Sequence, residues 1–82
     1  MILVDIYVPS VGQTYDFRLD ENAQIQVMIE EIAEMIATKE RTNLVGDPRD
    51  LILCDRLNKR TLPDDRSLRE CGIGNGSSML LV

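Results

Sequence analysis

The sequence contains no histidine, which removes most of the usual catalytic and metal-binding arrangements. Nucleophilic catalysis with a histidine base is excluded. The common zinc, haem and iron–sulfur sites are excluded as well, because they need histidine or more than the 2 cysteines that the chain has. The acidic residues within 47–50 and 64–65 lack the spacing of a calcium-binding loop. We therefore expect no cofactor, no metal ion and no enzymatic activity.

Apolar runs of membrane length and a basic N-terminus are also missing. No run approaches the roughly 18 residues that identify a membrane span. The N-terminal segment reaches Asp5 without the positively charged start of a signal peptide. We therefore expect a cytoplasmic protein that does not insert into a membrane. A chain of 82 residues with an ordinary globular composition is expected to form a single domain, residues 1–82.

Positive charge is scarce, and the net charge is −5. Nucleic-acid binding is therefore not expected, since that binding depends on neutralising phosphates. Residues 1–40 hold eight acidic and two basic residues (net −6), and residues 41–82 hold six and seven (net +1). The acidic first half favours a basic protein partner, with an ordinary solvated surface as the alternative. Cys54 and Cys71 are expected to be small buried hydrophobic residues, with a disulfide or a reactive thiol as the alternative.

The first 20 residues have the pattern of a β-hairpin. Residues 2–8 are apolar and β-branched, residues 9–13 contain the Pro and Gly of a turn, and residues 14–20 alternate strictly. If Asp5 faces water, period-2 alternation directs Leu3 and Tyr7 outward as well. The predicted inward residues of the two strands are Ile2, Val4, Ile6, Val8, Tyr15, Phe17 and Leu19.

The period then changes to that of a helix over residues 22–40. Asn22 is the predicted N-cap, with a start two residues later as the alternative. Apolar residues at helical spacing predict one buried face: Ile25, Met28, Ile29, Ile32, Met35 and Ile36. Glu30, Glu31 and Glu34 lie off this face and form a second candidate surface, suited to docking a basic segment.

The second half of the chain predicts short strands. We expect a loop over 42–50, a strand over 51–54, a turn over 55–60, an extended piece over 61–68 and a final strand over 77–82. The element order is then β-β-α-β-β-β. It predicts an α+β domain in which one helix packs on one face of a mixed sheet of four to five strands.

The segment GIGNG (72–76) superficially resembles a phosphate-binding loop. Such a loop opens onto a helix, whereas these glycines precede a strand and no lysine stands at the required place. We therefore predict a tight turn, in which Gly74, Asn75 or Gly76 supplies a positive φ.

Residues 61–82 (TLPDDRSLRECGIGNGSSMLLV) resemble the end of ubiquitin-like β-grasp domains. They share a Leu before a polar turn, an Arg-Ser-Leu step, an Ile, and Ser followed by alternating Leu. Within that superfamily the chain is most similar to the YukD-like (EsaB/YukD) proteins of bacterial type VII secretion systems. The likeness rests on YDFRL (15–19) and on the L-x-x-C-G-I-x-N-G pattern of residues 68–76. It implies a ubiquitin-like β-grasp fold over essentially the whole chain.

The resemblance implies a non-enzymatic accessory or regulatory adaptor of the apparatus that exports small helical WxG substrates. The implied partner is the secretion ATPase or another membrane component. One alternative is an excised N-terminal ubiquitin-like domain of a larger membrane secretion component. Another is a protein modifier or sulfur carrier, which needs a C-terminal Gly-Gly. This sequence ends in MLLV and has only Lys39 and Lys59 as lysines, so we do not expect conjugation.

In a ubiquitin-like fold the sheet face opposite the helix is open, and strand alternation decides which side chains lie on it. The predicted inward residues of the third and last strands are Leu51, Leu53, Met79 and Leu81. The predicted partner-binding surface consists of Ile52, Leu80 and Val82, extended by Leu3 and Tyr7 and rimmed by Arg49, Arg56 and Arg60. Two alternatives remain. The exposed aliphatic residues carry no function, or residues 78–82 pair with another copy of the chain.

Overall fold

The N-terminal hairpin forms as the alternation predicts. A computed structural model of the chain describes residues 1–42 and 46–82. Strand β1 (Ile2–Val8) pairs antiparallel with β2 (Gln13–Leu19), in a register that runs from Ile2 opposite Leu19 to Val8 opposite Gln13. The bounds of β1 are those predicted, and β2 lies one residue earlier than predicted. The predicted inward residues of β1 and β2 are buried or half-buried, and Leu3 and Tyr7 face outward.

Helix α1 (Ile25–Glu40) begins two residues later than a cap at Asn22 would give, which agrees with the later start predicted as the alternative. Gln24 is the N-cap residue, and its side chain makes no capping hydrogen bond. Two N–H groups of the first turn are instead satisfied by the chain after β4: Ile25 donates to the carbonyl of Arg66 at 2.8 Å, and Gln26 to that of Asp64 at 2.9 Å. A tertiary contact thus replaces the side-chain cap, which is why the local signal at Asn22 was wrong.

The buried face of α1 matches the predicted periodicity at all but one position. Its buried residues are Ile25, Met28, Ile29, Ile32, Ala33 and Ile36. Met35, which we predicted to be buried, is 47% exposed. It lies at the margin of the apolar stripe, where α1 passes beside β2, and the helix buries Ala33 against the sheet in its place.

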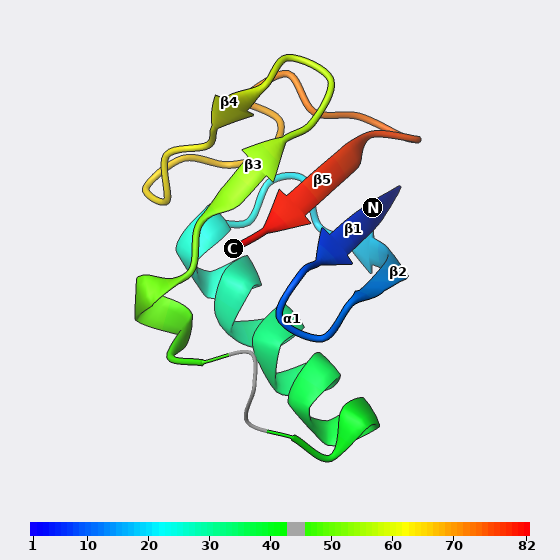
Figure 1. The fold of residues 1–82 in the computed structure, drawn as a ribbon. Coiled ribbons are helices and arrows are strands. Elements are labelled where there is room, and N and C mark those ends of the chain that lie inside the picture. The colour runs from blue at the N-terminus through cyan, green and yellow to red at the C-terminus, as the bar shows by residue number, and fades with distance from the viewer. Residues whose placement is uncertain (43–45) are drawn as a thin grey trace.

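The sheet has five strands in the order β2-β1-β5-β3-β4. The last three strands are β3 (Leu53–Asp55), β4 (Arg60–Thr61) and β5 (Ser78–Leu81), and a short 3₁₀ helix, η1 (Pro48–Asp50), precedes β3. β1 and β5 are parallel and the other pairs antiparallel, so the sheet is mixed. Figure 1 shows α1 crossing one face of this sheet. The predicted α+β architecture, with one helix on one face, is confirmed.

The core lies between α1 and the inner face of the sheet. Leu53, Met79 and Leu81 are buried as predicted, and Leu51 is half-buried against the core. The strand predicted over 51–54 is shorter and later, at 53–55. Ile52 nevertheless extends the ladder, because its N–H and C=O bond to Val82 at 2.7 and 3.0 Å. Of the loop predicted over 42–50, residues 43–45 lie outside the described residues.

The glycine-rich segment is a turn, as predicted. Gly72 and Gly76 have φ of +77° and +82°, values that favour glycine, and β5 rather than a helix follows. Asn75 serves the turn differently than expected: its side-chain oxygen accepts a hydrogen bond from the N–H of Leu3 at 2.8 Å. Cys54 and Cys71 are both free thiols rather than a disulfide, and they are half-buried, which is less than the burial expected.

Candidate functional site

The sheet face opposite α1 has an apolar row of side chains across its centre. Tyr7 of β1 is paired with Leu80 of β5, and Leu80 is paired with Cys54 of β3. Directly paired residues share a face of the sheet, so these three side chains lie side by side. All three are half-buried by one another and remain accessible.

A second apolar pair adjoins this row. Ile52 and Val82 exchange two backbone hydrogen bonds and are 45% and 48% exposed. Each lies two residues from Cys54 or Leu80 along its strand and therefore on the same face. We call Tyr7, Ile52, Cys54, Leu80 and Val82 the open-face patch. Cys54 was missed at the sequence level, although the alternation that directed Ile52 outward applies equally to it.

Leu3 is separated from the open-face patch. It lies four residues before Tyr7 on β1, and the polar pair Asp5 and Ser78 occupies the row between them. The Ser78 hydroxyl donates to both carboxylate oxygens of Asp5, at 2.9 and 3.0 Å. Leu3 is 53% exposed beyond this row. The strand pattern alone placed Leu3 on the correct face, but its distance from the patch depends on the register between β1 and β5.

Of the three arginines predicted to rim the patch, only Arg56 does so. Its guanidinium carbon lies 5.9 Å from the centre of the Tyr7 ring, within the range of a cation–π contact. Arg49 is paired with Asp47 in the loop before β3, at 3.0 Å. Arg60 approaches the buried Asp55 at 3.5 Å and donates to the carbonyl of Cys71.

Asp55 holds the turn that carries Arg56. Its carboxylate accepts hydrogen bonds from the side-chain amide of Asn58 at 2.8 Å and from the N–H of Leu57 at 3.2 Å. The hydrogen bond from Asn58 contributes most to lowering the pKa of Asp55 below its ordinary value, burial opposes this effect, and the Arg60 charge supports it. A charged Asp55 thus fixes the β3–β4 turn beside the open-face patch.

The three glutamates of the predicted acidic surface lie on α1. Glu30, Glu31 and Glu34 are all exposed, and within residues 1–42 and 46–82 none of them forms an ion pair. Glu30 and Glu34 stand one helical turn apart, which places like charges side by side at a small cost to helix stability. Gln26 donates to Glu30 at 3.4 Å.

Neither a metal-binding cluster nor a membrane-spanning helix occurs within residues 1–42 and 46–82. They include no cluster of three or more side chains able to hold a metal ion. Among those same residues, no helix is long and apolar enough to cross a membrane.

Comparison with known proteins identifies the family. A family model described as "WXG100 protein secretion system (Wss), protein YukD" matches residues 2–81. The chain belongs to the YukD family. The resemblance inferred from residues 15–19 and 68–76 is thereby confirmed. No curated protein sequence matches this YukD-family chain significantly.

Solved structures similar to this YukD-family chain are ubiquitin-like. The N-terminal ubiquitin-like domain in the 4931431F19Rik protein has a TM-score of 0.76 at 22% identity, over 99% of this chain and 72% of that one. A ubiquitin-like domain from Arabidopsis thaliana has a TM-score of 0.74 at 18% identity, over 99% and 74% of the two chains. The ubiquitin of Caldiarchaeum subterraneum has a TM-score of 0.69 at 16% identity, over 98% and 89%. At these identities the likeness establishes the fold.

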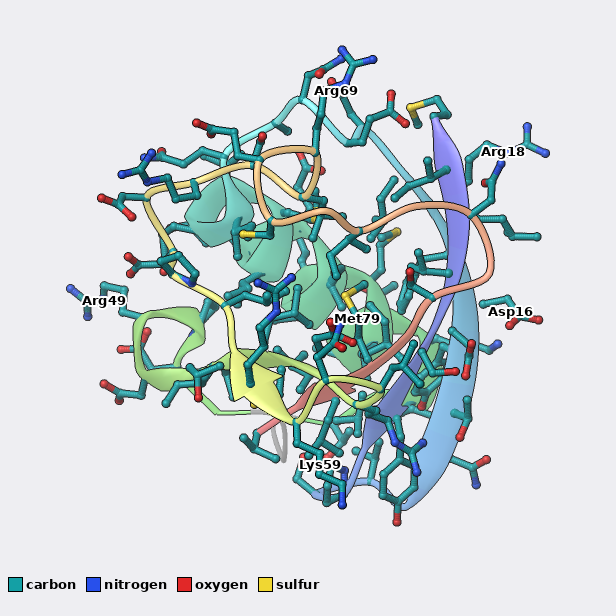
Figure 2. All side chains as sticks on the ribbon, turned by 90° about the horizontal axis from the view of Figure 1, so that it is seen from above. Asp16, Arg18, Arg49, Lys59, Arg69 and Met79 are labelled. Atoms are coloured by element: carbon teal, nitrogen blue, oxygen red, sulfur yellow. The ribbon has the colours of Figure 1, made fainter. Side chains whose placement is uncertain are left out.

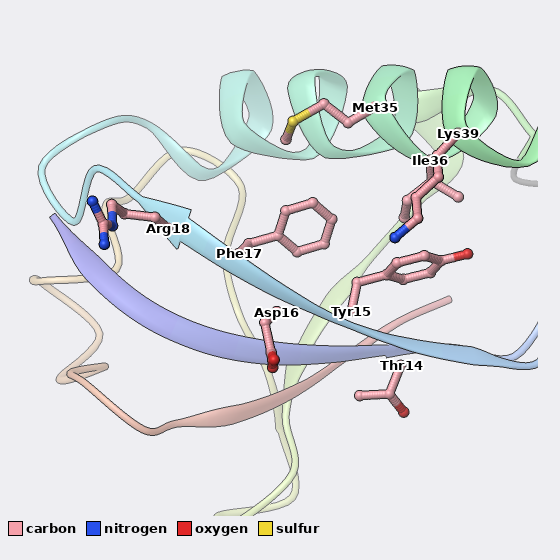
Figure 3. A pocket seen from close by; sticks show the side chains of 8 residues that line it. All are labelled: Thr14, Tyr15, Asp16, Phe17, Arg18, Met35, Ile36 and Lys39. Carbon is pink, nitrogen blue, oxygen red and sulfur yellow. The ribbon is translucent and has the colours of Figure 1, made fainter.

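The structure also contains a groove that sequence reasoning missed. It lies between β2 and α1, has a volume of about 610 Å³, and is lined by Phe17, Met35, Ile36 and Lys39 among others. Figure 3 shows Phe17 and Tyr15 rising from β2 toward Met35 and Lys39 on the helix above. The groove is accessible because Met35 is exposed. The helical spacing predicted Met35 to be buried, so the sequence did not indicate the groove.

Proposed function

We propose that this YukD-family chain is a non-enzymatic, ubiquitin-like accessory adaptor of a WXG100 (type VII) secretion system, and that it acts by binding another protein through the open-face patch. The observation that carries the proposal is the continuity of this patch. Five accessible side chains from three strands adjoin one another on a face that the helix leaves uncovered. Contiguous exposed apolar surface of this kind is typical of interaction sites, whereas single exposed aliphatics are not.

The composition of the patch suits a protein partner. Its aliphatic centre at Leu80 is flanked by Tyr7 with Arg56 above it, and aromatic and Arg residues are over-represented at binding hot spots. The charged row of Asp5 bounds the patch on one side and would give the polar rim that such interfaces have. The partner implied by the family is the secretion ATPase or another membrane component, which this chain would bind on its cytoplasmic side.

The test is an NMR titration of the labelled protein with cytosolic segments of its host's secretion apparatus, beginning with the ATPase. We expect shifts at Tyr7, Ile52 and Leu80. The variants Ile52→Ser and Leu80→Ser should abolish these shifts and leave the fold intact. Val27→Ser is the matched control, because Val27 is also 45% exposed but lies on α1, away from the open face.

The acidic surface gives the competing result. If Glu30, Glu31 and Glu34 shift instead, and binding weakens steeply as salt rises, the adaptor role stands but the proposed site is wrong. If no cytosolic segment of the apparatus produces shifts, or if Val27→Ser is as damaging as Leu80→Ser, docking through the open-face patch is refuted.

A further inference from the structure

Strand β2 leaves one edge of the sheet open within the described residues. The backbone hydrogen bonds of β1 show which β2 residues direct their own N–H and C=O groups toward this open edge. The C=O of Leu3 accepts from Gly76, and the N–H of Asp5 donates to Ser77, so these two residues direct their backbone groups toward β5. The alternate residues of β1, such as Val4 and Ile6, must then form their backbone hydrogen bonds with β2. By the observed register, Tyr15 and Phe17 face β1, so Thr14, Asp16 and Arg18 direct their N–H and C=O groups outward.

This edge lacks most of the features that usually prevent strand pairing. The seven residues of β2 pair with β1 without interruption, contain no proline, and include the strong strand formers Thr14, Tyr15 and Phe17. Edge strands are commonly protected by proline, bulges, short length or a covering element. The only charged side chains along β2 are Asp16 and Arg18, which have opposite signs. Opposite charges two residues apart suit pairing with an antiparallel strand of the same sequence.

In a single copy these two charges are poorly placed. Asp16 is directly opposite Asp5, and like charges in that position destabilise a sheet. Neither Asp16 nor Arg18 forms an ion pair within residues 1–42 and 46–82. Figure 2 shows both side chains projecting from the same outer margin of the molecule. A positively charged side chain brought beside Asp16 would therefore offset its repulsion with Asp5.

A second copy supplies that cation in one register. An antiparallel pairing centred on Asp16 would oppose two carboxylates. Moving the centre by one residue, to Phe17, places Asp16 opposite the partner's Arg18, and Arg18 opposite the partner's Asp16. Both registers bring the outward N–H and C=O groups of Asp16 into the new ladder. Charge thus selects the register centred on Phe17.

The same register matches the apolar side of the edge. Phe17 would lie opposite the partner's Phe17, on the face that carries α1. That face holds the groove of about 610 Å³ between β2 and α1, where Met35 is 47% exposed. The phenyl rings of two copies would meet beside the two Met35 side chains. Aromatic pairs of this kind are among the stronger cross-strand contacts.

We propose that this protein forms a homodimer by antiparallel pairing of its β2 edges, in the register centred on Phe17. A two-fold axis perpendicular to the sheet relates the copies, so both open-face patches point to the same side. The proposal does not depend on the function of those patches. A single strand pair is a small interface, and interfaces of less than about 1,200 Å² are typical of weak, concentration-dependent association.

The first test is sedimentation equilibrium of the full chain from about 10 µM to about 1 mM, a range suited to weak association. We expect the wild type to become dimeric as its concentration rises. Arg18→Asp opposes Asp16 with an aspartate, Asp16→Arg opposes Arg18 with an arginine, and each should weaken dimerisation at least about 10-fold. The double variant Asp16→Arg, Arg18→Asp restores opposite charges and should recover it. A fold defect would not be rescued by the second substitution.

Hydrogen exchange locates the contact independently of charge. The outward amides of Asp16 and Arg18 should exchange fast in dilute protein and gain protection at high concentration, while those of Tyr15 and Phe17 stay protected in both. A chain that remains monomeric throughout, including one whose β2 edge binds only a strand from another protein, refutes the proposal. A dimer whose affinity is unchanged by both single substitutions refutes it as well, and shows that the copies associate through another surface.

Discussion

Leu80 and Leu81 are adjacent in β5 and chemically identical, yet truncating them should have very different effects. Leu81 is 1% exposed and packs in the core opposite Leu53, whereas Leu80 lies half-buried on the open face. Leu81→Ala should lower the free energy of unfolding by about 2 to 5 kcal/mol, the usual cost of removing a buried leucine. Leu80→Ala should cost less than about 1.5 kcal/mol, because only part of its surface is withdrawn from water.

The difference is large compared with the total stability. A domain of 82 residues is expected to be stable by about 4 to 12 kcal/mol, so Leu81→Ala removes a substantial share. A loss of about 3 kcal/mol corresponds to a fall in Tm of about 12 to 24 °C for a domain of this size. The location near the C-terminus should not lessen the effect much, since Val82 and Ile52 close the ladder with two hydrogen bonds.

The assay is urea unfolding of the wild type and both variants at one pH, with thermal unfolding as the second measurement. Equal losses, or a larger loss for Leu80→Ala, would refute the assignment of faces in β5. The open-face patch would then have to be abandoned, because its membership follows from the same alternation.

Two further predictions concern ionisable groups that stabilise turns and ends. Asp55→Asn weakens the anchor of the β3–β4 turn and should cost about 1 to 3 kcal/mol at neutral pH. Because the pKa of Asp55 is lowered in the folded state, chiefly by Asn58, its contribution is present above its unfolded pKa and lost as pH falls through the folded pKa. In urea unfolding at pH values from neutral to about 2, the free energy of unfolding of the variant should therefore fall less with decreasing pH than that of the wild type. Tyr15 donates to Glu40 at 2.7 Å, and burial, with help from Glu40, raises its pKa to about 12. Its contribution is fully present below the unfolded pKa of about 10 and lost as pH rises toward 12. Tyr15→Phe should cost about 1 kcal/mol near neutral pH and remove this alkaline loss; an unchanged alkaline limb would contradict the assignment.

Much of the fold could be predicted from local sequence patterns, because few arrangements bury the apolar residues of each strand and of the helix. The alternation of residues 2–8 fixed which side of β1 is buried, and the 3.6-residue period of α1 identified its core face. Once the face of β5 was set by Met79 and Leu81, the outward position of Leu80 was determined. Alternation alone does not contain the strand order β2-β1-β5-β3-β4, which the structure gives.

The remaining features depend on contacts between distant segments. The start of α1 is set by carbonyls of Asp64 and Arg66, which a local capping rule cannot include. The separation of Leu3 from Tyr7 and Leu80 by a polar row depends on the β1–β5 register. The groove beside Met35 depends on where α1 lies relative to β2. The cap at Asn22 and the burial of Met35 were predicted wrongly, and the position of Leu3 was predicted without its neighbours, because each depends on tertiary geometry.

The aliphatic character of the open face is not explained by the fold. A central strand needs β-forming residues outward, and threonine or valine would satisfy that need at position 80 as well as leucine does. One exposed leucine would be ordinary. Ile52, Leu80 and Val82 together expose apolar surface on two adjacent strands, and contact of this surface with water is unfavourable. Folding alone does not require these aliphatic side chains, and the proposed docking through the open-face patch would account for them.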